Sequence, residues 1–156
     1  MQVHHVKNLA TLSQELTELK SKGKKLVFTN GCFDLIHRGH LQYLEAARQL
    51  GSKLIVAINS DASVKQLNGP SRPIKPETDR LMTMAAFYFV DAVVLFSQET
   101  PAVVIDKLIP DFLVKGGDYK PEEIVGYNTV TKHGGKVLSL DFVEGHSSSQ
   151  FIEKMS

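Results

Sequence analysis

The chain has 156 residues, the usual length of one domain. Hydrophobic residues make up 42% of it and charged residues 22%, a balance typical of a folded protein and not of a disordered one. With 18 basic and 17 acidic side chains the formal net charge is +1, so no global charge attracts the chain to nucleic acid or to an anionic membrane. We therefore expect one domain over residues 1–156, with neither nucleic acid nor membrane as partner.

The single cysteine, Cys32, excludes an intramolecular disulfide and a cysteine-rich zinc site. No apolar run approaches the ~20 residues that a membrane-spanning helix needs. The first residues also lack the charged and apolar segments of a secretory signal. We therefore expect the protein in the cytoplasm.

The first predicted element is an amphipathic helix, because leucines at positions 9, 12, 16 and 19 share one helical stripe that ends at Gly23. Short apolar runs then alternate with helical patterns. In chain order the sequence predicts a strand over 25–29, a helix over 39–50, a strand over 53–58, a loop over 67–76, a helix over 77–89, a strand over 92–96, a helix over 100–109, a strand over 111–114, a helix over 122–133, a strand over 136–140 and a short helix over 147–155.

Two details support these boundaries. Three prolines and a glycine favour a loop over 67–76. Thr100 followed by Pro101 is typical of a helix N-cap and the first helical position.

The five predicted strands are continuous apolar runs, as expected when helices cover both faces of a sheet. Their alternation with helices indicates an α/β fold with a doubly wound, Rossmann-like parallel sheet of five strands. In such sheets ligands bind beyond the carboxyl ends of the strands. The loops that follow the strands are therefore the place to look for chemistry.

Two histidines stand out in the loop after the first strand. His37 and His40 flank Gly39 at the start of a predicted helix, so they lie about one turn apart on one face. Backbone N–H groups at a helix start bind anions, and imidazole nitrogens beside them can donate to phosphate oxygens. This arrangement suits a pentavalent phosphorus transition state. Two alternatives stay open: ordinary surface or capping histidines, and a zinc site, for which two histidines alone are weak support.

The same loop carries a family resemblance. Gly31-Cys32-Phe33-Asp34 followed by His37-Arg38-Gly39-His40 resembles the His-x-Gly-His signature of the cytidylyltransferase-like nucleotidyltransferases. Further segments resemble the adenylyltransferase domains of bacterial ADP-heptose synthases, and the similarity extends over residues 8–155. These segments are Asn59-Ser60-Asp61, Gly69-Pro70-Ser71-Arg72-Pro73, Val114-Lys115-Gly116-Gly117-Asp118-Tyr119 and Gly134-Gly135-Lys136-Val137.

The resemblance implies a reaction and a fold of the nucleotidyltransferase type. D-glycero-β-D-manno-heptose 1-phosphate would attack the α-phosphorus of ATP in line, giving ADP-heptose for lipopolysaccharide and related surface sugars, and pyrophosphate. No covalent enzyme intermediate is expected, so the protein supplies position and charge. Mg²⁺ would arrive with ATP, without a protein ligand that we can name. The partners would be ATP and the sugar 1-phosphate, in a homodimer.

Two other functions stay open beside this one. The first is a cytidylyltransferase that acts on glycerol 3-phosphate or another small phosphate. The second is a nucleotide-sensing domain without turnover, which the presence of both signature histidines disfavours.

The resemblance also implies roles for individual residues. Catalysis would depend on His37, His40 and Arg80. The nucleotide would be bound by Asn30, Gly31, Cys32, Phe33, His37, His40, Lys115, Gly117, Asp118, Ser147, Ser148 and Ser149. The acceptor would be bound by Asp34, Arg72, Lys75 and Arg80.

Several of these residues have a structural alternative. Phe33 could be plain core packing, and Arg80 a solvated helix residue that binds no phosphate. Asp34 could hold a basic side chain instead of the sugar hydroxyls, or it could cap a helix. Asp118 could form a turn, and Ser147 could cap the last helix whatever the ligand.

The proline-rich loop departs from the family pattern at one point. Asn68-Gly69 stands where relatives often have Lys-Gly. The missing charge would then come from Lys65, Arg72 or Lys75. A catalytic thiol at Cys32 is not expected.

Overall fold

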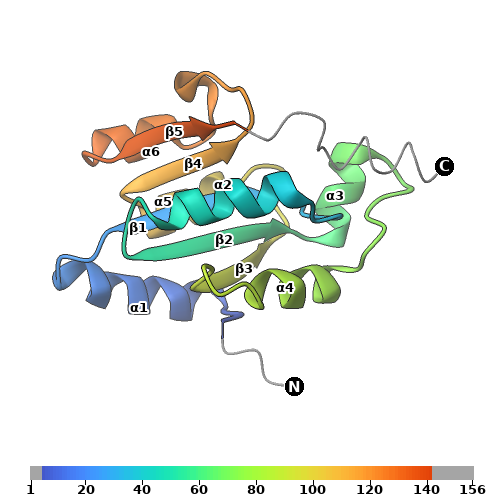
Figure 1. The fold of residues 1–156 in the computed structure, drawn as a ribbon, viewed down its shortest axis with the longest axis horizontal. Coiled ribbons are helices and arrows are strands. Elements are labelled where there is room, and N and C mark those ends of the chain that lie inside the picture. Colours follow the sequence, from blue (N-terminus) through green and yellow to red (C-terminus); the bar gives the residue numbers. More distant parts are fainter. Residues whose placement is uncertain (1–4, 142–156) are drawn as a thin grey trace.

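A parallel sheet of five strands runs through the protein in the order β3-β2-β1-β4-β5 (Figure 1). The computed structural model describes residues 5–141. All four strand pairs are parallel. The strands are β1 (Leu26–Gly31), β2 (Lys53–Asn59), β3 (Ala92–Phe96), β4 (Phe112–Gly116) and β5 (Lys136–Leu140). This confirms the predicted Rossmann-like sheet.

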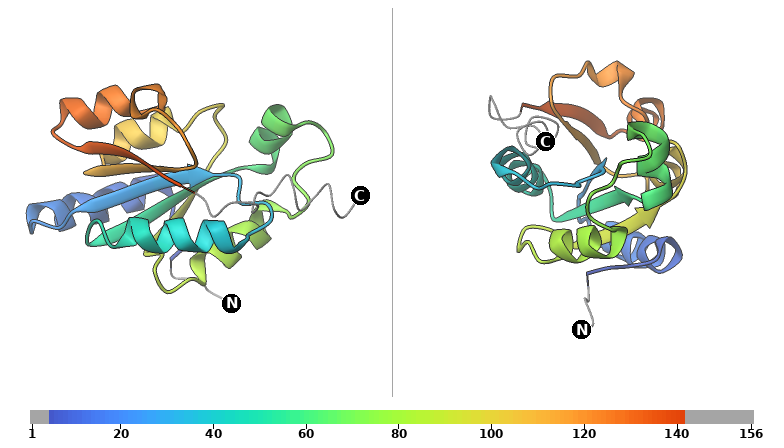
Figure 2. Two further views of the ribbon diagram at one scale, coloured as in Figure 1. Left: turned by 45° about the horizontal axis from the view of Figure 1, so that its top comes forward. Right: turned by 90° about the vertical axis from the view of Figure 1, so that its right-hand side faces the viewer.

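Helices cover both faces of the sheet (Figure 2). The helices are α1 (Leu9–Ser21), α2 (Arg38–Arg48), α3 (Asp61–Asn68), α4 (Glu77–Ala85), α5 (Ala102–Leu108) and α6 (Tyr127–Lys132), with a 3₁₀ turn η1 (Pro121–Glu123). Alternate strand residues serve different cores, because successive side chains of a strand point to opposite faces. Phe28 packs in the core formed with α1, α5 and α6, and its neighbour Val27 packs in the core formed with α2 and α4.

Four predicted helices have different boundaries in the structure, and the one predicted over 39–50 spans Arg38–Arg48. The helix predicted over 77–89 ends at Ala85. The helix predicted over 122–133 is divided into η1 and α6 by Gly126, whose φ of 96° is left-handed. A side chain at Gly126 would lie 2.7 Å from Ile105, so the close approach of α5 requires glycine there. The cap of α5 is Pro101, although the Thr100 hydroxyl accepts a long 3.4 Å bond from the Ala102 N–H.

One helix was not predicted at all. α3 lies beyond the end of β2 (Figure 1) and is short, with Ser60 as its N-cap. The helix predicted over 147–155 lies outside the described residues. Among residues 5–141, none of the helices combines the length and the apolar character that crossing a bilayer requires.

Candidate functional site

The loop from β1 to α2 begins at the carboxyl edge of the sheet, where β1 lies between β2 and β4. Phe33 takes a left-handed φ of 48° in this loop and is buried. Its ring meets the His40 ring edge-on at 5.4 Å between centroids. A Cβ at Gly31 would lie 3.0 Å from the same ring, so the glycine lets the strand end approach it. Phe33 therefore packs the base of the loop.

The two histidines cap α2 reciprocally. His37 is the N-cap, and its Nδ1 accepts a hydrogen bond from the Gly39 N–H at 3.1 Å. The His40 Nδ1 accepts from the His37 N–H at 3.2 Å. The two rings stack with centroids 3.8 Å apart. Both side chains are buried. The capping alternative and the phosphate hypothesis are compatible, because the capping bonds use only the Nδ1 atoms.

This geometry sets the tautomers. A neutral imidazole that accepts at Nδ1 carries its proton on Nε2. Burial, and then the neighbouring His37, lower the pKa of His40 from 6.5 to about 4. His40 is therefore neutral at physiological pH and holds an Nε2–H donor of the kind that binds a phosphate oxygen.

A pocket of about 180 Å³ opens beside the pair. It is lined by Asn30, Gly31, Cys32, Phe33, His40, Tyr43, Lys115, Gly116 and Tyr119. Six of these were predicted as nucleotide contacts. Tyr43, Gly116 and Tyr119 were not, although the last two lie within the segment Val114–Tyr119 that the family resemblance singles out.

A second pocket of about 130 Å³ continues from the first toward η1. Asn30, Lys115 and Tyr119 line both pockets. The Lys115 ammonium lies 5.5 Å from the centre of the Tyr119 ring, and burial lowers the pKa of this lysine. The site therefore holds a cation that is partly stripped of water, which favours an anionic ligand.

Cys32 lines the pocket and carries a thiol. Its Sγ is 3.6 Å from the Asn68 amide nitrogen and 3.8 Å from the Asn59 amide oxygen. Burial raises its pKa, so a reactive thiolate is disfavoured.

Arg80 differs from its prediction. It is neither a solvated residue nor open to a ligand: it is 1% exposed, and its guanidinium makes four hydrogen bonds within the protein. The acceptors are the carbonyls of Lys75, Cys32 and Asn59 and a carboxylate oxygen of Asp61, at 2.7–3.0 Å. The guanidinium thus joins the carboxyl ends of two neighbouring strands, because Cys32 directly follows β1 and Asn59 is the last residue of β2.

Asp34 binds the proline-rich loop in this structure. Its buried carboxylate accepts the backbone N–H groups of Ile74 and Lys75 at 2.9–3.0 Å. The Arg72 Nη1 lies 3.9 Å away, so a basic side chain is its more distant partner. Asp34 caps no helix; it anchors the proline-rich loop.

The remaining predicted residues are spread around this centre. Arg72 is half-buried, and Lys75 and Lys65 are exposed. Gly117 has a left-handed φ of 121°, and Asp118 beside it is exposed and lines neither pocket. Ser147, Ser148 and Ser149 lie outside the described residues. Within residues 5–141, no group of three or more His, Cys, Asp or Glu side chains could hold a metal ion.

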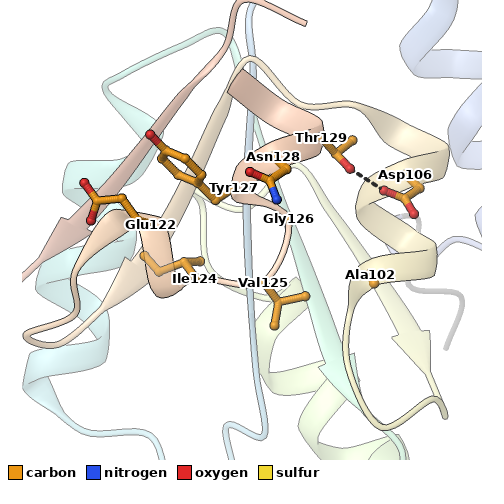
Figure 3. Close-up of a pocket in the computed structure, with 9 residues that line it drawn as sticks. All are labelled: Ala102, Asp106, Glu122, Ile124, Val125, Gly126, Tyr127, Asn128 and Thr129. Atoms are coloured by element: carbon orange, nitrogen blue, oxygen red, sulfur yellow. Dashed lines mark hydrogen bonds between the residues drawn. The ribbon is translucent and has the colours of Figure 1, made fainter. Parts of the chain in front are cut away.

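A further cavity of about 310 Å³ lies away from the histidines, between α5 and the segment from η1 to α6 (Figure 3). Asp106 of α5 accepts a hydrogen bond from the Thr129 hydroxyl of α6 at 2.7 Å on its wall. None of the residues predicted to act in catalysis or binding lines this cavity.

The chain is similar in sequence to a known family and to proteins from several bacteria. The family model described as cytidylyltransferase-like matches residues 28–154. The bifunctional protein HldE of Alkalilimnicola ehrlichii is 51% identical over 144 residues, which are 92% of this chain and 30% of that protein. HldE of Campylobacter jejuni subsp. doylei is 53% identical over 149 residues, 96% of this chain and 32% of that protein. The chain thus spans about a third of the length of these relatives.

Solved structures share the fold. The lipopolysaccharide core biosynthesis protein from Thermoplasma volcanium superposes with a TM-score of 0.64 at 28% identity, over 80% of this chain and 100% of that one. The pantoate-beta-alanine ligase of Francisella tularensis superposes with a TM-score of 0.62 at 14% identity, over 92% of this chain and 68% of that one. The second likeness concerns the fold alone.

Proposed function

This chain belongs to the cytidylyltransferase-like family, and from that premise we propose that it transfers the adenylyl group of ATP to D-glycero-β-D-manno-heptose 1-phosphate. The products are ADP-heptose, for lipopolysaccharide core or related surface sugars, and pyrophosphate. The observation that carries the proposal is the His37–His40 pair, which caps α2 beside a pocket at the carboxyl edge of the sheet. The identity of about 50% to HldE proteins supports heptose phosphate as the acceptor.

The reaction is an in-line displacement. A phosphate oxygen of the sugar 1-phosphate bonds to the α-phosphorus of ATP, and the bond from that phosphorus to the bridging oxygen of pyrophosphate breaks. The Nε2–H groups of His37 and His40 donate to phosphate oxygens whose negative charge grows in the transition state. The N–H groups at the start of α2 add a favourable partial charge.

The pocket beside the histidines receives the nucleotide. Asn30, Gly31, Cys32 and Phe33 line it, and Lys115 supplies positive charge. Gly117, Asp118 and the serines at 147–149 extend the binding surface in this proposal. The acceptor phosphate binds beside the proline-rich loop that carries Arg72 and Lys75.

Mg²⁺ bound to ATP would neutralise part of the charge of the two polyanions and, because it would keep several water ligands, would need few ligands from the protein. A homodimer in the cytoplasm completes the proposal.

A nucleotide and acceptor panel tests the function. The purified chain is incubated with Mg²⁺, ATP or CTP, and either the heptose 1-phosphate or glycerol 3-phosphate, and pyrophosphate release is measured. We expect release with ATP and the heptose 1-phosphate, and a loss of it in His37→Ala. Faster release with CTP and glycerol 3-phosphate would assign the chain to the cytidylyltransferase alternative. Release from none of the pairs would reject nucleotidyl transfer.

A further inference from the structure

We propose that Asp34 and Arg80 are positioning residues that clamp the proline-rich loop and place Arg72 to bind the acceptor phosphate. The proposal rests on the proposed function for the identity of the acceptor. The clamp itself is a feature of the fold and does not depend on the proposed function.

Asp34 holds the loop through its backbone. Three short contacts join its two carboxylate oxygens to the N–H groups of Ile74 and Lys75. Asp34 is only 6% exposed, so water competes little for these bonds. Hydrogen bonds to an ionised acceptor are about twice as strong as neutral ones. These bonds tie the loop to Asp34 at Ile74 and Lys75.

Arg80 binds the backbone of the same residue, Lys75, through its carbonyl group. Its Nε donates to the Lys75 carbonyl at 3.0 Å, while Nη1 donates to the Cys32 carbonyl at 2.7 Å. Residue 75 is thus held at its N–H by one side chain and at its carbonyl by the other. Cys32 lines the nucleotide pocket, so the clamp links the loop directly to the wall of that pocket.

The clamp distinguishes Arg72 from the other basic candidates. The Arg72 guanidinium lies 3.9 Å from Asp34, which is ion-pair range but too long for a hydrogen bond. Its side chain makes no hydrogen bond to any other residue in the stretch 5–141. Arg72 is therefore oriented by Asp34 while its donors stay available for a phosphate, and an arginine binds phosphate with two parallel bonds. Lys75 is exposed, and its backbone serves the clamp.

The experiment compares Asp34→Asn with Asp111→Asn in the full chain. Asp111 is a matched control, because its carboxylate also accepts a backbone N–H, that of Leu26 at 2.8 Å, at the opposite end of the strands. The first measurement is hydrogen exchange of the backbone amides, which needs no substrate. We expect exchange at Ile74 and Lys75 to be at least tenfold faster in Asp34→Asn and unchanged there in Asp111→Asn.

The second measurement separates the two substrates. In Asp34→Asn, and in Arg72→Gln, we expect KM for the heptose 1-phosphate to rise about tenfold while the Kd of the non-hydrolysable ATP analogue changes less than twofold. Unchanged exchange at Ile74 and Lys75 would overturn the clamp even if the enzyme is active. Faster exchange with an unchanged acceptor KM, or an equal loss of nucleotide affinity, would overturn the assignment of Arg72. A wild-type chain that turns over no sugar phosphate would reject the proposed function and leave the exchange result to decide the clamp.

Discussion

The imidazole rings of His37 and His40 stack 3.8 Å apart, and each Nδ1 accepts a backbone N–H at the start of α2, from Gly39 and from the N-cap His37 respectively. The same bonds that cap the helix therefore orient both rings and place their protons on Nε2. Pre-orientation of this kind lowers the cost of reorganisation when charge develops on a ligand.

Replacing His37 with alanine should lower turnover by roughly 10²–10³, the usual effect of removing one preorganised transition-state donor. The Kd of the nucleotide should change less, because the donor matters most in the transition state. His133→Ala is the matched control, since His133 is the exposed C-cap of α6 and its Nδ1 is hydrogen-bonded to the Thr129 carbonyl. Steady-state pyrophosphate release measures the rates. Wild-type turnover in His37→Ala would remove His37 from the mechanism.

The low pKa of His40 predicts an acid-sensitive fold. The pKa is about 4 in the folded state and 6.5 as a reference, so between these values the unfolded chain binds the extra proton. Stability is fully present above pH 6.5 and falls as the pH drops toward 4, with a loss of about 2 kcal/mol between pH 7 and pH 5.

The variant His40→Gln isolates this effect. Glutamine at the same helix position can complete a capping box and does not titrate. Urea unfolding at the two pH values should show a smaller pH dependence in His40→Gln than in the wild type. Equal pH dependence in both proteins would contradict the assignment to His40.

Arg80→Lys should destabilise the fold by about 3 kcal/mol, because a lysine cannot satisfy the buried carbonyls and carboxylate that the guanidinium binds. The control is Arg48→Lys. Arg48 pairs with Asp91 at 2.8 Å near the surface, where such pairs contribute about 1 kcal/mol or less. Denaturant unfolding measures both. A loss in Arg80→Lys no larger than the control would show that the buried network contributes little.

Lys115→Met should weaken nucleotide binding about tenfold while the packing of the half-buried side chain is retained. The reason is the loss of one charge-assisted bond, which typically contributes about 1.5–3 kcal/mol. Lys107→Met, on the exposed face of α5, is the control. Calorimetric titration with the non-hydrolysable ATP analogue measures the affinities. Equal affinity in Lys115→Met and the wild type would place the phosphates away from Lys115.

Local patterns predicted most of the elements, and the reasons are physical. Apolar runs such as Leu54–Ile58 require burial on both faces, which a parallel sheet provides. The pair His37 and His40 was recognisable because three residues of helix bring two side chains together without help from the rest of the fold. α3 was missed because it is short, and its first residue is held by distant partners: the Asp61 N–H donates to Glu77, and its carboxylate pairs with Arg80.

The sequence by itself determined the sheet, the histidine pair and the strand ends where the pocket lies, since each depends on residues a few positions apart. Only the tertiary structure decided what Asp34 and Arg80 do. Arg80 meets Cys32 across 48 positions of chain, and Asp34 meets Lys75 across 41. A charged side chain next to a phosphate-binding motif can bind a ligand or bind the protein, and the choice depends on which carbonyls and N–H groups the folded chain brings within 3 Å of it. That arrangement is a property of the packed loops and is not encoded in any local spacing.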